Sequence, residues 1–158
     1  MAYDPSWPER FDEERRLLED ALAPWLVRGV HHVGSTAVPG LAAKPVVDVL
    51  AGVESLEASR PAIEALAPLE YVYAAYRTEY MHWFCKPSPA RRTHHLHLIP
   101  HDHPQFAARL RFRDALRADP VLAAEYEALK RRLAAEHRDD REAYTDAKAA
   151  FVERVSAA

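Results

Sequence analysis

A valine-rich run at residues 46–53, VVDVLAGV, restricts the fold more than any other stretch of this 158-residue chain. Apolar and β-branched residues in a run of this length predict a buried strand. Because side chains alternate between the two faces of a strand, Asp48 and Leu50 fall on the face opposite Val47 and Val49. The chain is therefore expected to form a sheet that carries a carboxylate on a central strand.

Asp48 is costly in such a strand unless it meets a cation, a metal ion or hydrogen-bond donors. The residues alone leave two interpretations open. The carboxylate pairs with the nearby Lys44 at the edge of the strand, or it serves a metal ion or a substrate. An ionisable group in a central strand is uncommon, which keeps the functional interpretation open.

The first two thirds of the chain predict a small sheet with helices beside it. Ser6 is placed to cap a first helix, whose apolar stripe runs to Leu26 and which ends before Gly29. A second helix is expected at about residues 59–68, where Pro61 fits a first turn. Further strands are expected at residues 30–33, 71–76, 81–86 and 95–99.

The last third of the chain, from residue 104 onward, is expected to be helical. Asp119-Pro120 reads as a cap followed by a favoured first helical residue, and residues 138–140 mark a second break. The sum is an α+β fold: a mixed β-sheet of about five strands, with flanking helices and a helical C-terminal third.

Composition limits the functional classes. With 158 residues and 49% hydrophobic content, the chain suits a single domain, residues 1–158. The net charge of −3 offers no general attraction to nucleic acid or to an anionic membrane. Neither a signal peptide nor a transmembrane run is expected. The single cysteine, Cys85, excludes an internal disulfide and fits a reducing compartment, so a cytoplasmic location is expected.

Gly34-Ser35-Thr36 forms a candidate phosphate-binding turn. Glycine lets the backbone approach a ligand closely, and the N–H groups and two hydroxyls of the turn can donate to phosphate oxygens. Gly-Ser pairs also occur in turns that bind nothing. The motif gains weight only if cations and a functional carboxylate lie beside it.

Three basic residues are candidates for that role. Lys44 and Lys86 each precede a proline at the boundary of an expected strand, where each could lean over a pocket at the strand end. Arg92 comes shortly before the histidine-rich strand. Together these three side chains are predicted to form a basic, phosphate-binding pocket.

His95 and His97 lie two residues apart in an expected strand. Both imidazoles therefore point to one face, while Leu96 and Leu98 point to the other. Such a pair can bind a divalent metal, bind a phosphoryl group, or act as acid and base. A histidine pair on one face favours a functional role over a structural one.

Several long stretches of this sequence resemble the GrpB family of small bacterial proteins. The match covers nearly the whole chain, and its motifs are YDPSWPERF, HVGSTAVPGLAAKPVVDVL, HHLHLIP, and the tail FRDALRADPVLAAEYEALKRRLAAEH followed by DREAYTDAKAAFV. GrpB proteins resemble nucleotidyltransferases by superfamily, which implies a nucleotidyltransferase-like fold. A similar domain is fused to dephospho-CoA kinase in some bacteria, which implies nucleotide or coenzyme A chemistry.

The nucleotidyltransferase resemblance implies roles for individual positions. Its pattern has a Gly-Ser turn for the triphosphate, carboxylates at i and i+2 of the next strand, and a third carboxylate on a neighbouring strand, which together hold two metal ions. Gly34 and Ser35 match the turn, and Asp48 matches the first carboxylate. Leu50 takes the second position, where it cannot bind a metal ion.

Histidine stands where the third carboxylate is sought. If the two strands lie side by side, Asp48, His95 and His97 approximate a two-histidine, one-carboxylate site for a divalent metal. Imidazole suits Zn²⁺ or Mn²⁺ better than Mg²⁺, and all three ions are candidates.

The expected function is binding of a nucleotide or a phosphorylated small molecule, with nucleotidyl transfer as the reaction class and Asp48 and His97 as catalytic residues. A second interpretation is a histidine-dependent nucleotide hydrolase or phosphotransferase that uses His95 or His97. A third is a non-enzymatic sensor or partner domain, in which hydrogen bonds satisfy the aspartate and the histidines. The alanine-rich helices of the tail are compatible with a homodimer.

Overall fold

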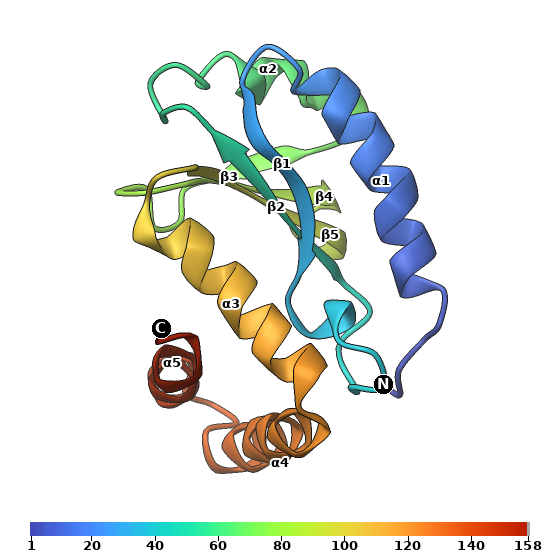
Figure 1. Cartoon of the computed structure of the whole chain (residues 1–158), viewed down its shortest axis with the longest axis vertical. Helices are drawn as coiled ribbons and strands as arrows, with labels where there is room; N and C mark the ends of the chain where they lie inside the picture. Colours follow the sequence, from blue (N-terminus) through green and yellow to red (C-terminus); the bar gives the residue numbers. More distant parts are fainter. Residues whose placement is uncertain (158) are drawn as a thin grey trace.

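Five strands form one mixed sheet in the order β1-β2-β5-β4-β3 (Figure 1). The computed structural model describes residues 1–157, apart from the side chain of Arg141. β2 and β5 are parallel, and the other neighbouring pairs are antiparallel. The strands are β1 (Leu26–Val33), β2 (Val47–Val53), β3 (Val72–Ala74), β4 (His82–Ser88) and β5 (Arg91–Pro100). The predicted α+β fold with a five-stranded mixed sheet is confirmed.

Helices lie against both faces of the sheet, and the chain ends in three consecutive helices (Figure 1). The helices are α1 (Trp7–Ala21), α2 (Ala62–Ala65), α3 (Pro104–Ala118), α4 (Pro120–Glu136) and α5 (Arg141–Ser156), and two short 3₁₀ helices are η1 (Ser35–Ala37) and η2 (Ala67–Leu69). α1 and α2 bury the face that carries Val47 and Val49. Phe106 of α3 packs on the opposite face beside Leu50. The predicted alternation in residues 46–53 is therefore confirmed, and Asp48 faces the α3 side.

The first helix is shorter than predicted, and the first strand is longer. α1 ends at Ala21, and β1 begins at Leu26 instead of after Gly29. Pro24 lacks an N–H and disfavours helical backbone at the residue before it, so the helix cannot continue into the expected stripe. Positive φ angles at Arg28 and Gly29 coincide with an irregularity in the pairing of β1 with β2.

The helix predicted at residues 59–68 is also much shorter. α2 spans only four residues, and η2 follows it. Pro61 is the N-cap of α2, and Pro68 lies inside η2. Two prolines this close together leave too few N–H groups in register for a longer α-helix.

The breaks predicted in the helical third are confirmed. The Asp119 carboxylate caps α4 by accepting from the N–H groups of Val121 and Leu122, at 3.0 and 3.2 Å. The Asp140 carboxylate caps α5 by accepting from the Ala143 N–H at 3.0 Å. Within residues 1–157, no helix is both long enough and apolar enough to cross a membrane.

The C-terminal helices pack on the loop between η1 and β2. Val38 and Leu41 of this loop are buried in one cluster with Tyr126 of α4. Glu127 Oε1 accepts a hydrogen bond from the Ala42 N–H at 2.7 Å. These contacts bring α4 beside the predicted phosphate-binding turn.

Glu14 of α1 makes a buried polar cluster on the face of the sheet that α1 covers. It is 4% exposed and accepts hydrogen bonds from the Tyr71 hydroxyl (2.7 Å) and the Lys86 ammonium (2.5 Å). His94 Nε2 lies 3.7 Å from Glu14 Oε2, and burial lowers the pKa of His94 to about 4. The cluster is thus a buried ion pair of Glu14 with Lys86, beside a neutral imidazole.

Candidate functional site

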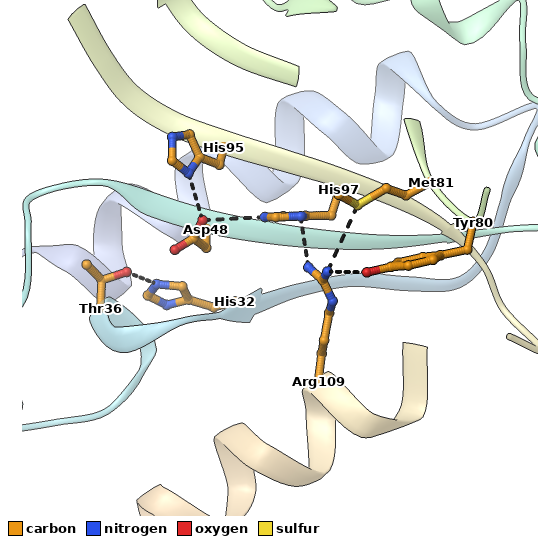
Figure 2. A network of polar contacts seen from close by, with 8 residues as sticks. All are labelled: His32, Thr36, Asp48, Tyr80, Met81, His95, His97 and Arg109. Carbon is orange, nitrogen blue, oxygen red and sulfur yellow. Dashed lines mark hydrogen bonds and ion pairs between the residues drawn. The ribbon is translucent and has the colours of Figure 1, made fainter. Parts of the chain in front are cut away.

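Asp48 stands at the centre of a polar network on the α3 side of the sheet (Figure 2). The parallel register of β2 and β5 pairs it with His95, so the adjacency assumed for the two strands is confirmed. Asp48 Oδ1 lies 3.1 Å from His95 Nδ1 and 3.4 Å from His97 Nε2. Burial alone would raise the pKa of the Asp48 carboxyl, but the two histidine contacts hold it well below its usual value. The ionised carboxylate therefore pairs with the histidines and not with Lys44.

His97 is held in one tautomer by α3. Arg109 Nη1 lies 2.8 Å from His97 Nδ1, and a guanidinium can only donate. Nδ1 must therefore accept, which places the ring proton on Nε2, where it is donated to Asp48. Burial, and then the charge of Arg109, lower the pKa of His97 to about 4. Both nitrogens of this neutral ring are engaged, so His97 positions Asp48 and presents no free nitrogen.

His95 differs from His97 in having one nitrogen without a partner. Its Nδ1 donates to the ionised Asp48, so in the neutral ring the lone pair is on Nε2. That Nε2 atom is buried and makes no hydrogen bond. Trp83 of β4 lies beside the ring, with a centroid separation of 5.1 Å. His95 is therefore the histidine of the pair with chemistry still available.

Gly34 brings the predicted turn directly against Asp48. Its φ is +77°, and a Cβ at this position would lie 2.4 Å from Asp48 Oδ2. Only glycine fits such an approach and such a backbone angle. The turn and the carboxylate that the sequence singled out are therefore one site.

A lysine that sequence reasoning missed reaches the same turn. Lys130 of α4 donates to Ser35 Oγ at 2.7 Å, and its Nζ lies 4.8 Å from the centroid of the Tyr126 ring. Lys148 of α5 lies 6.0 Å from the same centroid. Burial, and then the charge of Lys148, lower the pKa of Lys130 to about 8. No sequence signal separates Lys130 from Arg131 and the other cations of α4, because the contact depends on how the helix packs.

The predicted basic pocket of Lys44, Lys86 and Arg92 is not formed as a unit. Lys44 is exposed, and its charge also lowers the pKa of Lys130, so it belongs to the Ser35 side of the site. Arg92 lies over the Trp83 ring, with its Cζ 5.3 Å from the centroid. Lys86 is on the opposite face, where it pairs with Glu14. Lys130 thus occupies the place that the sequence analysis gave to Lys86.

Thr36 is also turned away from the predicted ligand position. It is 2% exposed, and its hydroxyl lies 2.9 Å from His32 Nε2 (Figure 2). Burial, and then the charge of Arg117, lower the pKa of His32 to about 4. The Thr36 side chain therefore fixes the shape of the turn, and Ser35 carries the available hydroxyl.

The donor set does not fit the two-metal arrangement. Leu50, at the position of the second carboxylate, is fully buried in the apolar cluster under α3. His95 and His97 both direct a proton at the same oxygen of Asp48, instead of directing lone pairs at a common point. Within residues 1–157, no group of three or more His, Cys, Asp or Glu side chains is arranged to hold a metal ion. A divalent metal at Asp48, His95 and His97 stays a prediction.

Comparison with known proteins identifies the family. The family model described as GrpB protein matches residues 1–158. The chain belongs to the GrpB family. The UPF0157 protein YqkA of Bacillus subtilis is 36% identical over 148 residues, which cover 94% of this chain and 43% of that protein. The glutamate-rich protein GrpB of Alkalihalophilus pseudofirmus is 32% identical, over 98% of this chain and 91% of its own.

Solved structures give the same assignment and extend it to the fold. A crystal structure of the conserved protein GrpB from Enterococcus faecalis has a TM-score of 0.85 and 35% identity, covering 99% of this GrpB chain and 93% of that one. Two more distant structures share the architecture. The structure of the GLD-2/RNP-8 complex has a TM-score of 0.56 and 13% identity, over 98% of this chain and 59% of that one. A cytoplasmic RNA terminal U-transferase has a TM-score of 0.54 and 14% identity, over 85% of this chain and 41% of that one. The GrpB fold is therefore nucleotidyltransferase-like.

One further relative carries the name of an enzyme. A protein named dephospho-CoA kinase in Mycolicibacterium paratuberculosis is 34% identical to this chain. The similarity covers 87% of this chain but 39% of that protein. The GrpB-like stretch is thus a minor part of the longer protein.

Proposed function

We propose that this GrpB protein binds the phosphate of a nucleotide or of another phosphorylated small molecule at Ser35. One observation carries the proposal: Lys130 Nζ lies 2.7 Å from Ser35 Oγ, on a turn whose backbone lies against Asp48. Ammonium, hydroxyl and backbone N–H groups are the donors that bind phosphate oxygens in proteins.

Lys130 and Lys148 beside Ser35 favour an anion, while the charges of Glu127 and Asp48 also act on Lys130. Within residues 1–157, neither Lys130 nor Lys148 forms an ion pair with a carboxylate. Glu127, the acidic residue nearest in sequence on α4, is engaged with the Ala42 N–H and with Arg131. Burial, and then repulsion from Lys148, lower the pKa of Lys130, and a bound phosphate would relieve that repulsion.

The comparisons support a nucleotide-related ligand. The fold is nucleotidyltransferase-like, and one relative is named dephospho-CoA kinase. Nucleotidyl transfer is the finer proposal, with Asp48 as its carboxylate. We rank phosphate binding ahead of transfer because Leu50 leaves Asp48 without the second carboxylate of the expected pair.

Lys130→Ala should weaken binding of inorganic tripolyphosphate at least tenfold, because hydrogen bonds to charged groups contribute about 1.5–3 kcal/mol. Isothermal titration calorimetry at pH 7 measures the change. Arg131→Ala is the matched control, since this neighbouring cation has 73% of its side chain exposed and pairs with Glu127. Unchanged affinity in Lys130→Ala, or an equal loss in Arg131→Ala, would reject the site.

A second candidate function is histidine-dependent phosphotransfer, and the free Nε2 of His95 favours it. In this candidate His95 Nε2 is the nucleophile. Asp48 accepts from Nδ1 on the opposite side of the ring and so orients it, as a carboxylate orients the histidine of a catalytic triad. The atom is buried, so a substrate would have to displace a neighbouring side chain to reach it.

This candidate predicts a covalent phospho- or nucleotidyl-histidine. Parallel incubations with γ-³²P- and α-³²P-labelled nucleotide should label the wild-type chain in one case: the γ label marks a phosphohistidine with nucleoside diphosphate released, and the α label marks a nucleotidyl-histidine with pyrophosphate released. His95→Gln should abolish the label. His97→Gln, which removes a ring with both nitrogens engaged, should retain at least part of it. A label that survives in His95→Gln, or its absence from the wild type, would exclude this chemistry.

A further inference from the structure

A bulge in β5 turns Arg92 onto the Asp48 face of the sheet. β4 and β5 pair Lys86 with His94 and then Pro87 with Arg92, so the register skips Thr93. One extra residue in a strand reverses the alternation of the side chains beyond it. His94 therefore lies near Glu14 on one face, while Arg92 lies over Trp83 on the other.

The Arg92 guanidinium lies over the Trp83 ring on the exposed side of this part of the sheet. Its Cζ lies 5.3 Å from the Trp83 ring centroid, and the residue is exposed. Its Nε donates to the Pro89 carbonyl at 3.0 Å, and no carboxylate pairs with it within residues 1–157. An exposed guanidinium that is fixed over an aromatic ring by such a hydrogen bond can offer a stacking surface to a planar ligand.

The surface continues onto a second aromatic residue. Tyr76 is 41% exposed and meets the Trp83 ring edge-on, with 6.0 Å between centroids. Arg77 lies 5.2 Å from the Tyr76 centroid and is exposed as well. The side chains of Arg92, Trp83, Tyr76 and Arg77 thus form a continuous row of guanidinium groups and rings, from β5 across β4 to the loop after β3.

This stacking surface lies across Asp48 from the Ser35 turn. His95 contacts Asp48 on one side and Trp83 on the other. Asp48 is in register with His95, and Trp83 is in register with His97. Asp48 and Trp83 are therefore two strand spacings and two residues apart, about 12 Å. That span suits a sugar and an attached base whose phosphates lie at Ser35.

We propose that the Arg92–Trp83 stack binds the aromatic base of the ligand. This inference rests on the phosphate site proposed above and narrows its ligand to a nucleotide, instead of a phosphorylated sugar. Stacking is tolerant of base identity because every base has a π face, so any of the common bases can occupy it.

The test compares ATP, GTP, CTP and UTP with inorganic tripolyphosphate, each titrated calorimetrically into wild type, Arg92→Ala and Arg91→Ala. We expect the best nucleotide to bind wild type at least tenfold more tightly than tripolyphosphate, as base stacking allows. Arg92→Ala should reduce that ratio to near one and leave tripolyphosphate affinity unchanged. Arg91→Ala is the control, because Arg91 is an exposed neighbour that lies over no ring among residues 1–157.

The other outcomes either overturn the base-binding inference or test it independently of the phosphate site at Ser35. A ratio that persists in Arg92→Ala places the base elsewhere, and equal losses for nucleotide and tripolyphosphate make Arg92 a phosphate ligand. Nucleotide binding that depends on Arg92 without tripolyphosphate binding supports the stack and rejects the Ser35 site. Binding of neither ligand class rejects both.

Discussion

Replacing Gly34 with alanine should destabilise the fold by about 3 kcal/mol and remove phosphate binding. The φ of +77° costs an L side chain roughly 1–2 kcal/mol. The new Cβ would also lie 2.4 Å from Asp48 Oδ2 and 2.9 Å from Asp48 Cβ. The turn or the strand must then shift, which moves Ser35 away from Lys130. Urea denaturation gives the change in unfolding free energy, and tripolyphosphate titration gives the change in binding.

Gly40→Ala is the matched control for this variant. Gly40 has a similar φ of +82°, but a Cβ there would meet no atom within 4 Å. Gly40→Ala should therefore lose only the stability that the backbone strain costs, about 1 kcal/mol, and should still bind tripolyphosphate. If both variants lose equal stability and both still bind, contact with Asp48 is not the reason for glycine at position 34.

Glu14→Ala should lower the free energy of unfolding by about 3–5 kcal/mol. The substitution leaves the Lys86 ammonium, 13% exposed, without its carboxylate, and leaves the Tyr71 hydroxyl without an acceptor. An unpaired buried charge costs more than the ion pair itself contributes. Thermal and urea unfolding monitored by circular dichroism measure the loss.

Two variants control for the helix and for the charge. Glu19→Ala, on the same helix but with 44% of its side chain exposed, should change stability by no more than about 1 kcal/mol. The double variant Glu14→Leu/Lys86→Met removes both charges and should recover most of the loss. A double variant as unstable as Glu14→Ala would show that packing, and not the isolated ammonium, accounts for the cost.

Local patterns predicted the strands and the caps of α4 and α5 well because these depend on backbone geometry over a few residues. Ser6 occupies the N-cap position of α1 as expected, but its side chain makes no capping hydrogen bond. Alternation in residues 46–53 gave the correct face for Asp48, and the Asp119-Pro120 pair gave the correct start of α4. Local patterns failed where one residue type suits two structures. Leu26 fits a helical stripe as well as a strand, and the neighbouring Pro24 decided the outcome.

The partners of the site depended on long-range packing. Alternation along β4 puts Lys86 on the same face as Phe84, where it pairs with Glu14 of α1. Lys130 is 95 residues from Ser35 in sequence and reaches it only because α4 packs on the loop after η1. No pattern within a helix specifies which surface that helix will cover.

The sequence by itself determined the Gly34-Ser35 turn, the carboxylate on a buried strand and the apolar residue where a second carboxylate was expected, since these follow from residue type and strand period. The tertiary structure decided what surrounds them. It gave Ser35 a lysine from α4, fixed His97 through Arg109, and turned Arg92 onto Trp83 through a bulge. The reason is physical: side-chain alternation is a property of a few consecutive residues, whereas a charged group finds its partner through the packing of the whole chain.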